Sequence, residues 1–219
     1  ITNQTPTIPT QGFQIPENSP NGSFIGTVLA SDPDTNQVLT YSILSGNVSG
    51  AVAIDTLTGI LTVANSSALN FEITPTISLQ VEAEDNGIPS LSSQATVTVS
   101  LIDLNEAPLI SNQSFAIAEN SANGSSVGTV VATDPDAGQT KTFSILSGNT
   151  NGAFTIHPLT GMLTVANSAV LNFETTPSIA LIIKVQDNGT GNLSSQATIT
   201  ISITDVNEVP VLNNQSFSI

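Results

Sequence analysis

Apolar and polar residues alternate along most of this 219-residue chain. Residues 77–83 and 95–101 place an apolar side chain at every second position, and residues 39–43 do so over a shorter run. In the segment 24–30 the same rule puts Phe24, Gly26, Val28 and Ala30 on one face. Turn-forming Asn-Gly, Asp-Pro-Asp and Ser-Gly-Asn sequences separate these runs, so the pattern predicts half-buried β-strands. No segment has sustained helical periodicity.

The pattern occurs twice. The segment Asp103-Leu104-Asn105-Glu106-Ala107-Pro108 returns 102 residues later as Asp205-Val206-Asn207-Glu208-Val209-Pro210, and the rest of the chain follows the same offset without insertion or deletion. About seven short strands in each copy are typical of an immunoglobulin-like β-sandwich. We therefore predict an all-β chain with repeats at 1–106 (residues 1–10 being an upstream linker) and 107–208, and a linker with the start of a third repeat at 209–219.

Charge and composition exclude several function classes. The net charge is -15, with two lysines as the only Lys or Arg residues, so neither nucleic acid nor an anionic membrane surface is an expected partner. The absence of cysteine excludes disulfides and zinc–thiolate sites. No apolar run is long enough to insert into a membrane.

The positions of the acidic residues are the most informative feature of the sequence. Of 17 acidic residues, 14 form seven pairs at the offset, and these lie at turns and strand ends. Clustered carboxylates repel one another, and two lysines cannot neutralise them. A divalent cation with all-oxygen ligands, Ca²⁺, is the expected partner. Glu82 and Glu84 do not recur and fall on the polar side of a strand, which indicates ordinary solvated surface.

Nearly the whole chain resembles two tandem cadherin repeats. The resemblance rests on five motifs, each present in both copies: Pro16-Glu17-Asn18 and Ala118-Glu119-Asn120, Asp32-Pro33-Asp34 and Asp134-Pro135-Asp136, residues 69–72 and 171–174, Asp85-Asn86-Gly87 and Asp187-Asn188-Gly189, and the two linkers. It implies seven-stranded Greek-key sandwiches and three Ca²⁺ at the junction of the repeats. The implied ligands are Glu17, Asn70, Glu72, Asp103, Asn105, Glu106, Asp134, Asp136 and Asp187.

Two departures from the cadherin pattern reduce the expected ion count to two or three. The linker is one residue shorter than usual, and Asn70 stands where an Asp is usual. Further half-sites are expected at the outer ends of the pair of repeats. Their residues are Asp32, Asp34, Asp85, Glu119, Glu174, Asp205, Asn207 and Glu208.

The resemblance implies a calcium-dependent adhesion or spacer module at the cell surface, outside the cell, with neighbouring cadherin-like repeats as partners and a surface protein or polysaccharide as a further one. The Thr/Asn/Ser-rich surface without arginine is similar to that of large bacterial surface proteins. The lone histidine, His157, does not recur and no Gly-x-Ser-x-Gly motif is present, so an enzyme is not expected. Two alternatives stay open: a calcium-dependent binding module for polysaccharide or another ligand, and an accessory domain of a secreted enzyme.

Overall fold

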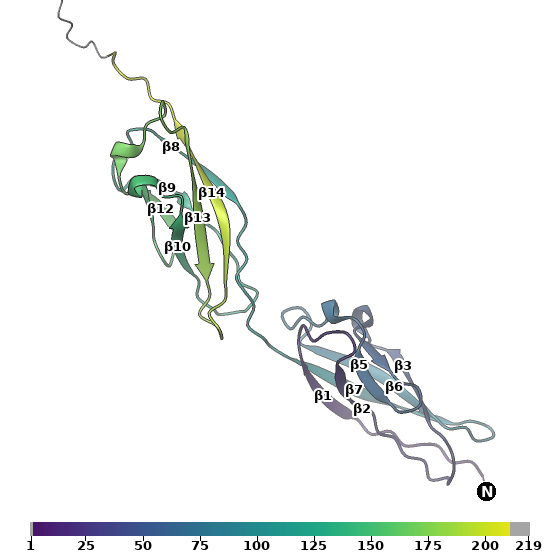
Figure 1. Ribbon diagram of the computed structural model, residues 1–219. Helices are drawn as coiled ribbons and strands as arrows, with labels where there is room; N and C mark the ends of the chain where they lie inside the picture. The colour runs from purple at the N-terminus through teal and green to yellow at the C-terminus, as the bar shows by residue number, and fades with distance from the viewer. Residues whose placement is uncertain (1, 211–219) are drawn as a thin grey trace, which may run out of the picture. The chain divides into compact units, whose positions relative to one another are not determined.

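The computed structural model describes residues 2–210 and divides into two compact units between Leu104 and Asn105 (Figure 1). The sequence suggested a boundary two residues later, after Glu106. Asn105 and Glu106 belong to the second unit because they hydrogen-bond to its turns. The expected third repeat falls mainly on 211–219, outside the described residues.

The first repeat has seven strands in two sheets, as predicted. One sheet has the order β1-β7-β6-β3 and the other β2-β5-β4. β1 runs parallel to β7, and the other paired strands are antiparallel. The strands are β1 (Gln11–Pro16), β2 (Phe24–Thr27), β3 (Thr40–Ser45), β4 (Val52–Ile54), β5 (Ile60–Val63), β6 (Thr76–Glu84) and β7 (Ser92–Ile102).

The second repeat has the same topology, with sheets β8-β14-β13-β10 and β9-β12-β11. Its strands are β8 (Gln113–Ala118), β9 (Ser126–Thr129), β10 (Thr142–Ser147), β11 (Phe154–Ile156), β12 (Met162–Val165), β13 (Ser178–Gln186) and β14 (Ser194–Thr204). Between residues 2 and 210 no helix has the length and apolar character needed to cross a membrane.

Each core lies between the two sheets of its repeat. The alternating apolar residues of β6 and β7 are buried, and Ile77, Leu79 and Val81 have no solvent exposure. The residues between them, such as Glu82, face outward. This confirms the strand periodicity and gives each repeat its own hydrophobic core.

The prediction that Phe24 lies on the same face as Gly26 and Val28 is wrong. A bulge interrupts the pairing of β2 between Phe24 and Gly26, so Ile25 is buried and Phe24 is 64% exposed. The ring of Phe13 lies where a side chain on Gly26 would stand. Glycine is therefore needed at this bulge for the close approach of the ring, and Gly128 with Phe115 repeats the arrangement.

Candidate metal-binding half-sites

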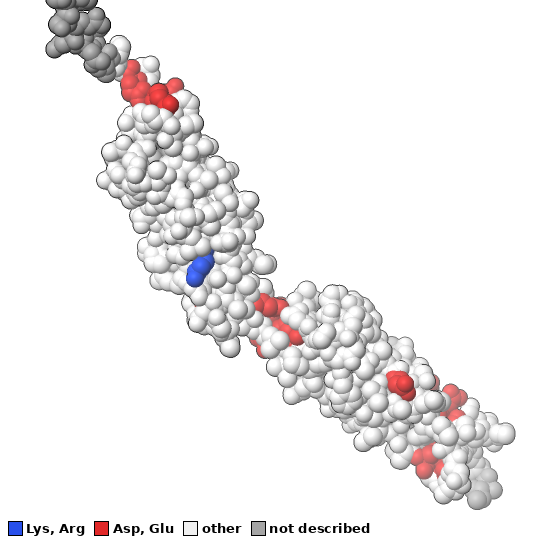
Figure 2. Space-filling model, in the orientation of Figure 1, with Lys and Arg blue, Asp and Glu red and all other residues white. Residues whose placement is uncertain are grey.

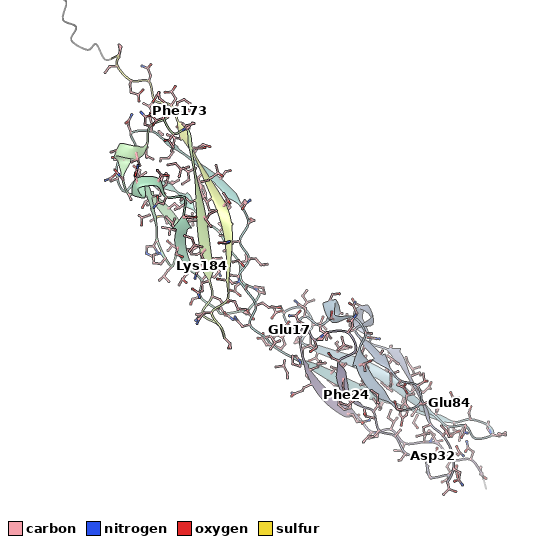
Figure 3. The ribbon with its side chains drawn as sticks, viewed as in Figure 1. Glu17, Phe24, Asp32, Glu84, Phe173 and Lys184 are labelled. Carbon is pink, nitrogen blue, oxygen red and sulfur yellow. The ribbon has the colours of Figure 1, made fainter. Side chains whose placement is uncertain are left out.

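Three carboxylates converge at one end of the first repeat. Glu17 follows β1, Asp103 follows β7 and Glu72 lies in the turn before β6. One oxygen from each lies within 4.8 Å of the others. Glu17 is 1% exposed, and its two oxygens accept the amides of Phe71 (2.8 Å) and Leu104 (2.9 Å). Figure 3 shows Glu17 and Asp32 at opposite ends of this repeat.

The second repeat has a four-carboxylate cluster at the equivalent end, made by Glu119, Glu174, Asp205 and Glu208, with ligand atoms within 4.8 Å of one another. Hydrogen bonds from the amides of Phe173 and then Val206 lower the pKa of Glu119. Desolvation, followed by the charges of Glu119 and Glu174, raises the pKa of Glu208. Glu208 therefore holds its proton more readily than an isolated glutamate does. Asn207 lies exposed in the same segment.

The other end of the second repeat carries three aspartates. Asp136 (6% exposed) and Asp187 (4% exposed) flank Asp134, whose Oδ1 accepts the Asp136 amide at 3.1 Å. Desolvation raises the pKa of Asp134, and the charges of Asp136 and Asp187 add to this effect. Within the described part of the chain, Asp134 Oδ2 is buried and has no hydrogen-bond partner. A buried carboxylate oxygen of this kind fits a cation ligand.

The linker is bonded to this end of the second repeat. The Glu106 amide donates to Asp136 Oδ2 (2.8 Å), and Asn105 Nδ2 donates to Asp187 Oδ2 (3.2 Å) and to the Thr190 carbonyl (3.0 Å). Gln139 Nε2 donates to Asn105 Oδ1 at 2.5 Å. Sequence reasoning missed Gln139, although Gln37 recurs there at the 102-residue offset.

The first repeat keeps a similar arrangement around Asp32, Asp34 and Asp85. Asn3 Nδ2 donates to both oxygens of Asp85 (3.1 Å each), and the Gln4 amide donates to Asp34 Oδ2 (2.6 Å). Burial acts to raise the pKa of Asp85, but hydrogen bonds from Leu91, Gly87 and Asn3 outweigh it and lower the pKa. Gln4 stands where the second repeat has Glu106, so this end has one carboxylate fewer.

Other residues singled out in the sequence have local partners. Asn70 Oδ1 accepts the Ile73 amide at 2.8 Å and so caps its own turn, while its expected role as a ligand stays a prediction. Glu82 lies on the outer face of β6, where Ser92 Oγ donates to it at 2.9 Å. His157 Nδ1 accepts the amides of Leu159 and Thr160, both at 3.3 Å, as expected for a turn residue.

Together the half-sites offer carboxylate and carbonyl oxygens, which suit Ca²⁺ and are poor ligands for softer metals. On the visible face of the second repeat, acidic atoms gather at the end where β14 finishes, and the middle of that face carries only basic and uncharged residues (Figure 2). The donor chemistry therefore fits calcium at the ends of each repeat.

The sequence profile of the cadherin domain matches residues 11–102 and 113–204. The chain belongs to the cadherin family. It is 35% identical over 194 residues to human protocadherin Fat 1 and 38% identical over 202 residues to mouse protocadherin Fat 2. These matches cover 86% and 89% of this chain but 4% of each relative. The expectation of a bacterial source stays a prediction.

Solved cadherin ectodomains have the same fold. Mouse cadherin-23 repeats 22–24 match with a TM-score of 0.67 and 27% identity, covering 94% of this chain and 68% of that one. Repeats 3–6 of protocadherin γB7, solved as a cis-dimer, match with a TM-score of 0.63 and 25% identity, covering 91% and 51%. The cadherin-type sandwich predicted from the sequence is thus confirmed.

Proposed function

We propose that this chain is a calcium-dependent adhesion or spacer module of an extracellular cell-surface protein, in which Ca²⁺ bound between the repeats stiffens the junction. The observation that carries the proposal is the position of two incomplete carboxylate sets along the chain. Glu17 of the first set binds the amide of Leu104, and Asp136 of the second set binds the amide of Glu106. Only Asn105 separates these anchor points in the sequence.

With one oxygen from each carboxylate, neither set alone reaches the six to eight oxygen ligands that a calcium ion takes. The expected carboxylate ligands are Glu17, Glu72 and Asp103 from the first repeat and Glu106, Asp134, Asp136 and Asp187 from the second, with Asn70 and Asn105 as further expected ligands. Shared ions would neutralise both sets at once, and this requires the two sets to stay together. Bound Ca²⁺ supplies positive charge and cross-links the sets, which converts a loose joint into a stiff one.

Bound calcium should stabilise the junction between the repeats appreciably. Ions at about 100 times their dissociation constant stabilise the bound form by roughly 2.7 kcal/mol. We expect two or three ions, and we expect each sandwich to stay folded without them because each has its own core. The family assignment supports neighbouring cadherin repeats as partners.

Calcium titration by calorimetry, with small-angle scattering before and after saturation, tests the proposal. Two or three bound ions and a narrower range of conformations are expected. Asp103→Asn should weaken binding, and the matched control Glu82→Gln, which removes one charge from a sheet face, should not. No heat of binding at millimolar Ca²⁺ would remove calcium from the mechanism, and equal affinities for both variants would remove Asp103 from the site.

A further inference from the structure

The linker side chain Asn105 has its hydrogen-bonding groups engaged by protein groups of the second repeat. Its Nδ2 donates to Asp187 Oδ2 and the Thr190 carbonyl, and its Oδ1 accepts from Gln139. Asp187 is 4% exposed and is itself held by the Gly189 amide at 3.0 Å. Asn105 and Gln139 are half-buried beside Asp187, so breaking these bonds would leave partly buried polar groups unpaired.

The same network is present in the first repeat, in a different segment of chain. Gln37 Nε2 donates to Asn3 Oδ1 at 2.5 Å, and Asn3 Nδ2 binds Asp85 and the Pro89 carbonyl (2.8 Å). This copy exists although Gln4 replaces the acidic residue that follows Asn105 in the junction linker. The network therefore does not depend on a full set of acidic residues.

In each repeat, a glycine without a side chain leaves room for this network. A side chain on Gly189 would overlap Asn105 Oδ1, and one on Gly87 would overlap the Asn3 amide. Downstream, Pro108 is buried, and Leu109 and Thr133 exchange backbone hydrogen bonds of 2.7 and 2.9 Å. From Asn105 onward the linker is thus tied to the second repeat, whereas Leu104 is tied to Glu17 of the first repeat.

From these contacts we infer that Gln139 and Asn105 form a metal-independent clamp, which fixes the linker on the second repeat and confines the hinge between repeats to the Leu104–Asn105 link. The clamp deepens the proposed function, on which it rests, because ions then need to immobilise only one link. It makes Gln139 a positioning residue for Asn105, whose Oδ1 keeps a second lone pair for the calcium-ligand role that the family resemblance implies.

The test compares Gln139→Leu with the matched control Gln37→Leu, which breaks the same network away from the junction. Amide exchange is followed by NMR in the calcium-free chain with a chelator present. In Gln139→Leu the protection of the Glu106 amide should fall about 5- to 100-fold, the range for unpairing a buried hydrogen-bonding group. In Gln37→Leu it should stay at the wild-type value.

A second measurement reports on the hinge itself. The chain has no cysteine, so Ser78→Cys and Ser202→Cys, at exposed strand positions, give one spin label on each repeat. The calcium-free distance distribution should broaden in Gln139→Leu and in Asn105→Ala, but not in Gln37→Leu. Thermal melts check that each variant is folded.

Equal Glu106 protection and equal distance distributions in Gln139→Leu and Gln37→Leu would overturn the clamp. Because both measurements are made without calcium, their result is separate from that of the calcium titration. If the wild type binds calcium but Gln139→Leu behaves like Gln37→Leu, the clamp is rejected and the proposed function is not. An intact clamp in a chain that binds no calcium rejects the proposed function alone.

Discussion

Replacing Asp134 by Asn should stabilise the calcium-free second repeat and reduce its stabilisation by calcium. Asp134 Oδ2 is buried without a hydrogen-bond partner and lies near two other buried carboxylates, Asp136 and Asp187. An amide of the same shape removes that charge and can keep the bond from the Asp136 amide. The calcium-free second repeat should therefore melt at a higher temperature in Asp134→Asn than in the wild type.

Calcium should stabilise the variant less than the wild type, because the substitution removes a charged ligand. If the affinity falls about tenfold, ions at about 100 times the wild-type dissociation constant are at about 10 times the new one. The calcium stabilisation then drops from roughly 2.7 to roughly 1.4 kcal/mol. For a repeat of this size, the calcium-induced rise in melting temperature should shrink by about 5–10 °C.

Differential scanning calorimetry with chelator and with saturating Ca²⁺ measures both effects. Asp55→Asn is the control, since it also removes one carboxylate charge but lies in an exposed turn before β5. The control should leave the calcium-induced shift unchanged. The reasoning is refuted if Asp134→Asn lowers the calcium-free melting temperature or keeps the full calcium response.

Three further predictions concern the sandwiches themselves. Gly26→Ala should destabilise the first repeat by about 1–3 kcal/mol in urea unfolding, because the new methyl group meets the Phe13 ring; an unchanged midpoint would show that the ring can move aside. Hydrogen bonds from Thr58 lower the pKa of Asp55, so its ionised form stabilises the fold above the unfolded-state pKa, and this is lost as pH falls through the folded-state pKa. Asp55→Ala should accordingly lower the melting temperature at about pH 7 and much less at about pH 2, and a pH-independent difference would contradict this. His157→Asp should raise the melting temperature of the second repeat by a few degrees, since aspartate accepts the same turn amides at shorter range; a decrease would argue against this.

The sequence was sufficient to predict that acidic residues gather at the repeat ends. Glu17 and Asp103 fall at the ends of strands β1 and β7, and β1 pairs in parallel with β7, so both carboxylates emerge at the same end. Gln139 escaped notice because a glutamine in a polar turn has no distinctive periodicity. Only the fold shows that it bonds Asn105, 34 residues away in sequence.

The bulge in β2 likewise could not be predicted from the sequence pattern. Alternation predicts the strand, but one extra residue shifts the faces, and Phe24 exchanges places with Ile25. The ring of Phe13, which comes from a strand of the other sheet, fills the space above Gly26. Local pattern cannot show a constraint imposed from across the sandwich.

The sequence by itself determined the two repeats, their strands, the cadherin family and the chemical type of ligand, because periodicity, repeat spacing and residue chemistry are all written along the chain. The tertiary structure decided which oxygens are buried and unpartnered, which are held by backbone amides, and which linker residues are tied to which repeat. These depend on contacts between residues far apart in sequence. Burial and hydrogen bonding arise only when those residues meet in the fold.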